Sequence, residues 1–195
     1  DSGDGRIVGV KLTRHPPKTE DLVSDLADAR INTVFTRERV IEEEQAFVKR
    51  CHAKGIEVYN IFGVLIDAKA IRKDPSLSQI NALGRPMTSQ RRNYRLVCPN
   101  RLDYRKRKIE TITSFLQRHP AVDGLSLDFI RYGVEWEMIK PDEEPGRDQM
   151  YCFCPVCLKK FRRECPLPED KTVGQLARII LQQHGEKWTA FKCRT

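Results

Sequence analysis

The stretch "VDGLSLDFIRYGVEWEM", residues 122–138, decides the fold. It starts as an apolar segment typical of a buried strand, yet it carries Asp128 in its middle. Charged and aromatic side chains follow at its exit: Arg131, Tyr132, Glu135, Trp136 and Glu137. Alternation along a strand puts Ser126, Asp128 and Ile130 on one face. Because a charged residue is rarely buried in a strand without a partner, Asp128 is predicted to be a site residue. The alternative is a structural carboxylate that caps a loop or pairs with an arginine.

Three further strand-and-helix units precede this strand. Strands are predicted at residues 6–13, 31–37 and 56–67, and helices at 17–30, 39–55 and 101–119. Gly55 is placed where a helix ends in a left-handed residue. The third strand is apolar almost throughout, which favours burial on both of its faces. Short turns from helix to strand predict a parallel sheet with right-handed crossovers, so the fold class is α/β.

Long polar segments follow the third and fourth strands. We interpret residues 67–100 as an exposed loop, and we predict a second insertion at 133–170. In parallel sheets and barrels, binding and catalytic residues gather at the carboxyl ends of the strands. The two insertions therefore mark the functional face.

Charge is concentrated in one segment. Residues 85–108 hold nine basic residues against Asp103 alone, an excess equal to the +8 of the whole chain. Such a segment could bind a phosphate, an acidic sugar or nucleic acid, or it could simply be a solvated loop and helix face. The sequence contains no apolar run long enough to span a bilayer and no recognisable leader, so no membrane span is expected.

The seven cysteines are an odd number, so internal disulfides cannot use all of them. Cys152, Cys154 and Cys157 have the close spacing of thiolate ligands and are predicted to hold a structural zinc ion. Cys165 is a fourth candidate, but eight residues of helix from Cys157 to Cys165 rise roughly 12 Å. Cys98 is another candidate for the fourth ligand. A disulfide with a spare thiol, or packing of small apolar side chains, remain the alternatives.

Several of these residues resemble a known family. "DGLSLDFIRY" is similar to the fourth strand, Asp-Gly-x-x-x-Asp-x-Ile-Arg-Tyr, of a mostly bacterial group of glycoside-hydrolase-like TIM barrels. Cys98, Pro99 and Asn100 resemble the Cys-Pro-x-Asn loop of that group, "NALGRPM" resembles the loop before it, and "CFCPVCLKKF" resembles a Cys-x-Cys-x-x-Cys segment found in some members. The resemblance covers about residues 6–165.

The resemblance implies a (β/α) barrel of TIM type, of which residues 1–195 would form the amino-terminal part. It implies an oligo- or polysaccharide substrate, and Asp128 as the catalytic or substrate-orienting carboxylate. Residues expected to bind substrate at the same rim are Arg131, Tyr132, Asn60, Asn100 and Trp136. No cofactor is required for this chemistry, and the resemblance favours an extracytoplasmic or secreted location.

Glycoside hydrolysis normally uses two carboxyl groups, and Asp128 supplies one. A complete eight-unit barrel takes about 250 residues, whereas only four strands are predicted here. Residues 172–195 read as an amphipathic helix with no fifth strand after it. The chain is therefore expected either to be a fragment that lacks the carboxyl-terminal half of the barrel or to complete its sheet by self-association.

Two other functions remain open at this stage. One is a non-catalytic carbohydrate-binding or scaffold module that lacks the second carboxylate. The other is a phosphate or nucleic-acid binder that uses residues 85–108, although nucleic acid is not the expected partner. No Ser-His-Asp pattern, phosphate-binding glycine loop or dinucleotide fingerprint is present in the sequence.

Overall fold

The chain falls into two units in the computed structural model, which describes residues 6–12, 19–43, 46–87, 94–133, 142 and 146–195. Unit 1 comprises Asp1–Gly63 and Lys108–Asp128, and unit 2 comprises Val64–Arg107 and Phe129–Thr195. Trp136, which the sequence assigns to the sugar-binding rim, lies outside the described residues.

Unit 1 contains a four-stranded sheet in which all neighbouring strands are parallel and follow chain order. Its strands are β1 (Gly9–Lys11), β2 (Thr33–Thr36), β3 (Glu57–Gly63) and β4 (Gly124–Asp128). This confirms the predicted α/β class and the four parallel strands. The fourth strand ends at Asp128, so Ile130, which the sequence places on a strand face with Ser126 and Asp128, lies beyond the strand.

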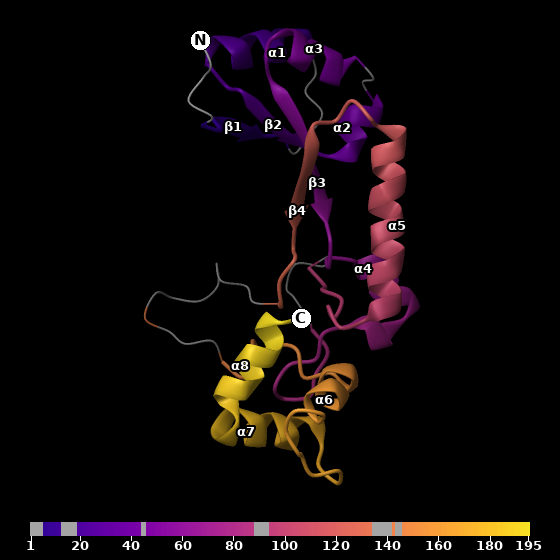
Figure 1. The fold of residues 1–195 in the computed structure, drawn as a ribbon, viewed down its shortest axis with the longest axis vertical. Helices are drawn as coiled ribbons and strands as arrows, with labels where there is room; N and C mark the ends of the chain where they lie inside the picture. The colour runs from indigo at the N-terminus through magenta and orange to yellow at the C-terminus, as the bar shows by residue number, and fades with distance from the viewer. Residues whose placement is uncertain (1–5, 13–18, 44–45, 88–93, 134–141, 143–145) are drawn as a thin grey trace. The chain divides into compact units, whose positions relative to one another are not determined.

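Helices cover one face of this sheet (Figure 1). They are α1 (Thr19–Asp28), α2 (Glu38–Glu43), α3 (Phe47–Ala53) and the part of α5 (Leu102–Arg118) that starts at Lys108. The sheet contributes Val34 and Val58 to the shared core, and α5 contributes Phe115, all without exposed surface. Gly55 has φ 70°, which confirms the predicted left-handed residue after α3.

The opposite face of the sheet is only partly covered. Along β3, buried residues alternate with residues that are exposed or half-buried, so the predicted burial on both faces is wrong. The described helices of unit 1 contribute to the core on the first face, whereas Phe35 and Tyr59 contact each other on the second, with ring centroids 5.6 Å apart. Asp128 lies on this second face, because it is in register with Gly63 and two residues beyond Ser126.

An ion pair joins the two outer strands of the sheet across that face. The Lys11 ammonium nitrogen in β1 lies 3.9 Å from Oδ2 of Asp128 in β4. In a flat sheet, β1 and β4 would be separated by three strand spacings, about 14 Å, and the two residues are also offset along the strands. The sheet is therefore curved toward the face that carries Asp128.

Unit 2 is built mainly from irregular chain and short helices: α4 (Ala68–Lys73), η1 (Pro75–Leu77), α6 (Pro155–Phe161), α7 (Val173–Gln183) and α8 (Gly185–Cys193). Residues 67–100 are not the exposed loop that the sequence indicates. Ile71, Leu77 and Leu96 from this segment are buried in the core of unit 2. Trp188 of α8 completes that core by stacking on Phe153, with ring centroids 4.9 Å apart. Among the described residues, no helix is both long and apolar enough to cross a membrane.

Candidate functional site

The Asp128 carboxylate stands at the carboxyl end of β4, with 41% of its side chain exposed. The Lys11 ammonium forms an ion pair with this carboxylate, with 3.9 Å between Nζ and Oδ2. Sequence reasoning missed Lys11, although a lysine inside the short apolar stretch "RIVGVKLT" is a signal that one strand face is polar. The pair therefore places one acidic and one basic group on the concave face of the sheet.

Asn60 lies on the other face of the sheet. It alternates with Tyr59 and Ile61 in β3, is in register with Leu125 and is 1% exposed. Its Oδ1 atom has no hydrogen-bond partner among the described residues. The structure therefore does not bring Asn60 to the surface that carries Asp128.

Arg131 and Tyr132 belong to unit 2. The Arg131 guanidinium donates to the Tyr94 hydroxyl at 3.5 Å. Tyr132 lines a cavity of about 380 Å³ together with Tyr151, Trp188 and Lys192, and the Lys192 ammonium lies 4.3 Å from the centre of its ring. Burial raises the pKa of the Tyr132 phenol, so this hydroxyl is neutral across the physiological range.

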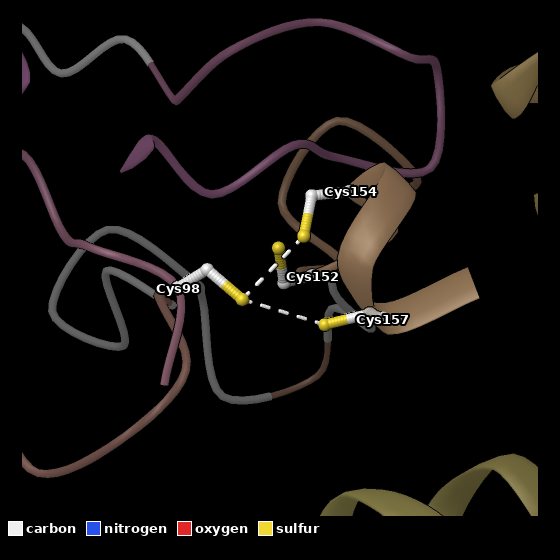
Figure 2. A group of neighbouring side chains, drawn as sticks. All are labelled: Cys98, Cys152, Cys154 and Cys157. Carbon is white, nitrogen blue, oxygen red and sulfur yellow. Dashed lines mark hydrogen bonds between the residues drawn. The ribbon is translucent and has the colours of Figure 1, made fainter. Parts of the chain in front are cut away.

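Four cysteines of unit 2 form the most concentrated group of potential ligands. Figure 2 shows the side chains of Cys98, Cys152, Cys154 and Cys157 directed toward one another. Their sulfur atoms all lie within 4.8 Å of one another, and each residue is at most 1% exposed. Cys98 comes from the segment after β3, Cys152 and Cys154 come from the segment that leads into α6, and Cys157 lies in the first turn of α6. Cys165 is buried but does not belong to this group.

The distances within the group fit a metal site better than disulfides. The Cys98 sulfur lies 3.4 Å from the Cys157 sulfur and 3.4 Å from the Cys154 sulfur, whereas a disulfide bond is about 2.05 Å long. A tetrahedron of sulfurs about 2.3 Å from a zinc ion has edges of about 3.8 Å. Four buried thiols at these distances match the donor set and the geometry of a closed structural zinc site.

The pKa values of two of these thiols shift in opposite directions. Hydrogen bonds with the thiols of Cys152, Cys157 and Cys98 lower the pKa of Cys154. Burial raises the pKa of Cys152, because a charged sulfur is poorly solvated there.

Asn100 lies beside the cysteines and is 3% exposed. Its Nδ2 atom donates to the Cys157 sulfur at 3.3 Å, and its Oδ1 atom accepts from the Lys160 ammonium at 2.5 Å. The structure therefore brings Asn100 together with the cysteines. A polar residue next to Cys-Pro in the sequence was the available signal, but it did not identify the partner.

Several residues of the basic segment make local contacts. Arg101 donates to the backbone carbonyl of Ser76, and Arg107 pairs with Asp103 at 3.3 Å. Lys108 lies over the Phe62 ring, 5.6 Å from its centre. Arg91 and Arg92 lie outside the described residues. These contacts account for several of the charges as local structural interactions.

Comparison with known proteins finds solved structures that share this fold. No family model matches the sequence, and no curated protein matches it. Among solved structures, the chain is similar to a β-galactosidase from Halorubrum lacusprofundi, with a TM-score of 0.58 and 20% identity over 82% of this chain. The chain therefore shares its fold with part of this protein. A β-galactosidase from Marinomonas ef1 gives a TM-score of 0.56 and 20% identity over 81% of the chain, and an α-L-fucosidase from Paenibacillus thiaminolyticus gives 0.52 and 17% over 95%.

The shared fold accounts for only part of those proteins. The chain spans 24% of the Halorubrum protein, 25% of the Marinomonas protein and 30% of the Paenibacillus protein. At identities of 20% or less, the likeness establishes the fold and leaves the chemistry to the residues of this chain.

Proposed function

We propose that the chain is the amino-terminal part of the (β/α) barrel of a carbohydrate-active, glycoside-hydrolase-like protein, with Asp128 as a catalytic or substrate-orienting carboxylate. The observation that carries this proposal is the position of Asp128 at the carboxyl end of β4, on the sheet face away from the helices. In a barrel, that face is the interior, and active sites lie at its carboxyl-terminal mouth.

The curvature of the sheet supports a barrel. The contact between Lys11 and Asp128 requires the outer strands to bend toward each other across the face that would line the interior. Strand-to-strand twist in an open sheet produces a saddle, whereas closure into a barrel produces a concave face of this kind.

Exposed apolar residues in unit 1 indicate where further structure would pack. Ile109 and Leu116 lie seven residues apart on α5 and are 61% and 39% exposed, and Leu127 of β4 is 49% exposed. In a barrel, the unit that follows β4 covers this region. We propose that additional strands and helices pack here, supplied by a longer chain or by self-association.

A second carboxylate must also come from outside the described strands. Among the described strand residues on the concave face, the other carboxylate is Glu57, in register with Thr33 at the amino end of the sheet. Asp128 is in register with Gly63, six residues further along β3, which is about 20 Å. Catalytic carboxylates of glycosidases are about 5–9.5 Å apart, so Glu57 cannot act with Asp128.

The test uses a longer protein that contains this chain and the strands that complete the barrel. Asp128→Asn should lower its turnover of aryl galactosides or aryl fucosides by at least about 100-fold, because the amide can neither transfer a proton nor attack as a nucleophile. Asp123→Asn is the matched control, since Asp123 also belongs to the fourth strand region but bonds to His52. Unchanged turnover in Asp128→Asn would remove Asp128 from the site.

A non-catalytic carbohydrate-binding module is the second candidate, favoured by the distance between Glu57 and Asp128. It predicts that the completed protein binds galactose- or fucose-containing oligosaccharides but does not hydrolyse them. Binding that is weakened by Asp128→Asn, together with no turnover in the wild-type protein, would decide for this candidate over the enzyme.

We further propose that Cys98, Cys152, Cys154 and Cys157 bind one structural zinc ion. This proposal rests on the short distances between four buried sulfur atoms that come from two segments of unit 2. A site closed by four thiolates has no open position for a substrate, so the metal would hold the two segments together and would take no part in sugar chemistry.

A further inference from the structure

A line of polar contacts leads from the surface helix α6 to the cysteine group. The Lys160 ammonium donates to Oδ1 of Asn100 at 2.5 Å, and Nδ2 of Asn100 donates to the Cys157 sulfur at 3.3 Å. Asn100 is 3% exposed, so its amide has left water and depends on these two partners. The amide oxygen faces the positive Lys160 ammonium, and the amide N–H group faces the sulfur of Cys157.

The charge of the proposed zinc site explains why such contacts are needed. Four thiolates and one divalent cation leave a net charge of about −2 among side chains that are at most 1% exposed. Burying such a charge is costly unless nearby donors or cations stabilise it. An N–H group that donates to sulfur favours the thiolate over the thiol, since the charged sulfur is the stronger acceptor.

Two other groups act in the same sense. The backbone N–H of Ile80 donates to the Cys152 sulfur at 3.4 Å. The Lys192 ammonium donates to the carbonyl of Tyr151, next to Cys152. Burial lowers the pKa of Lys192, while the negative charges of Cys152 and Cys157 act to raise it. Donors and cations therefore approach the group from more than one side.

We propose that Asn100 and Lys160 are positioning residues of the four-thiolate centre. Asn100 orients the Cys157 sulfur and stabilises its charge, and Lys160 fixes the Asn100 amide and supplies a compensating positive charge. The inference rests on the zinc site proposed above. It assigns Asn100 to the metal centre instead of the sugar-binding rim.

The experiment measures zinc content and zinc affinity of the purified chain by competition with a chelator. Asn100→Asp keeps the shape of the side chain but removes the N–H donor and adds a negative charge, so affinity should fall by about 10- to 100-fold. Lys160→Met should weaken binding in the same direction but less, and Lys160→Arg, which keeps a cationic donor, should retain most of the affinity.

Lys159→Met is the matched control, because Lys159 is the exposed neighbour of Lys160 on the same helix. It removes the same charge and should leave zinc affinity unchanged. Cobalt substitution gives a second readout: loss of the N–H bond to Cys157 should shift the sulfur-to-cobalt charge-transfer absorption in Asn100→Asp. Circular dichroism establishes that each variant is folded.

The outcomes separate the two proposals. Zinc binding by the wild-type chain with equal affinity in Asn100→Asp, Lys160→Met and Lys159→Met would overturn the positioning role and leave the metal site in place. A wild-type chain that binds neither zinc nor cobalt would overturn the metal site and the positioning role together.

Discussion

Two aspartates bracket the fourth strand and serve different purposes. Asp123 precedes β4, and its Oδ2 accepts from the backbone N–H of Val58 at 2.7 Å and lies 2.8 Å from Nε2 of His52. Asp128 ends the strand and faces the concave side of the sheet, where it meets Lys11. The first acid therefore connects the start of β4 to β3 and α3, whereas the second pairs with a cation of β1 on the concave face.

Replacing Asp123 should produce a pH-dependent loss of stability. Burial alone would raise the pKa of this carboxyl, but the bonds from Val58 and His52 outweigh it and lower the pKa below its ordinary value. The folded-state pKa is below the unfolded-state pKa, so the carboxylate stabilises the fold above the unfolded-state pKa of about 3.9. That contribution disappears as the pH falls through the folded-state pKa.

Asp123→Asn is therefore expected to lower the free energy of unfolding by about 1 kcal/mol near neutral pH. The difference from wild type should shrink in strongly acidic buffer. Urea denaturation at the two pH values checks this, and an equal difference at both would contradict the role assigned to the charge.

For single residues of the strands, the sequence predicted that Asp128 and Leu127 lie on opposite faces of the sheet, but it did not predict which face the helices cover. Strand alternation correctly separates Asp128 from Leu127. It contains no information about where helices pack, so Asn60 was expected at the same rim as Asp128 although it lies on the helix-covered face. Lys11 became relevant only through the curvature of the sheet, which depends on strands distant in sequence.

Among the elements, the strands were the most predictable and the helix ends the least. Apolar runs located all four strands, because each run is bounded by polar or turn residues. The single helix expected over 172–195 is divided into α7 and α8 at His184. Helix α6 ends at Phe161, so Cys157 and Cys165 do not share one helix. Residues 67–100 have no regular period because their apolar side chains pack from irregular chain around the cysteines, a contact pattern that periodicity does not detect.

The start of α7 offers a prediction at the scale of one helix. Thr172 is its N-cap: the Thr172 hydroxyl accepts from the backbone N–H of Gln175 at 3.4 Å, and the Gln175 side chain accepts from the backbone N–H of Thr172 at 2.9 Å. Thr172→Ala should lower the free energy of unfolding by about 1 kcal/mol, because both exchanged bonds depend on the capped conformation.

Thr172→Ser keeps the hydroxyl and serves as the control. Chemical denaturation of the whole chain, monitored by far-ultraviolet circular dichroism, measures the free energy of unfolding of both variants. An alanine variant as stable as the serine variant would show that the capping interaction does not stabilise α7.

At the scale of the whole molecule, the chain divides into two units, so the effect of the proposed metal on stability can be measured separately in the unit that holds the cysteines and in the unit that holds the sheet. The four cysteines all belong to unit 2, and the parallel sheet belongs to unit 1. The sequence predicted the α/β class and singled out three of the four grouped cysteines as candidate ligands, and it left Cys98 and Cys165 as candidates for the fourth. Spacing along the chain could not decide between them, because the approach of Cys98 depends on how a long segment folds back.

Removal of zinc should destabilise unit 2 selectively. A metal that binds only the folded unit, at a free concentration about 1,000 times its Kd, stabilises it by about 4 kcal/mol. Hydrogen exchange after chelation should therefore speed up in α6, α7 and α8 and remain slow in β2 and β3. Equal acceleration in both sets of elements, or none in α6, would contradict a structural metal confined to unit 2.

The arrangement of the two units along the chain also sets an order of biosynthesis. Unit 1 has all its residues once Asp128 has left the ribosome, whereas unit 2 still lacks everything from Phe129 onward. Cys98 emerges 59 residues before Cys157, so α5 and β4 are synthesised before this thiol can meet the other cysteines of the group. The residues of the sheet are therefore complete first, and binding of the proposed zinc ion would be a late step in synthesis of the chain.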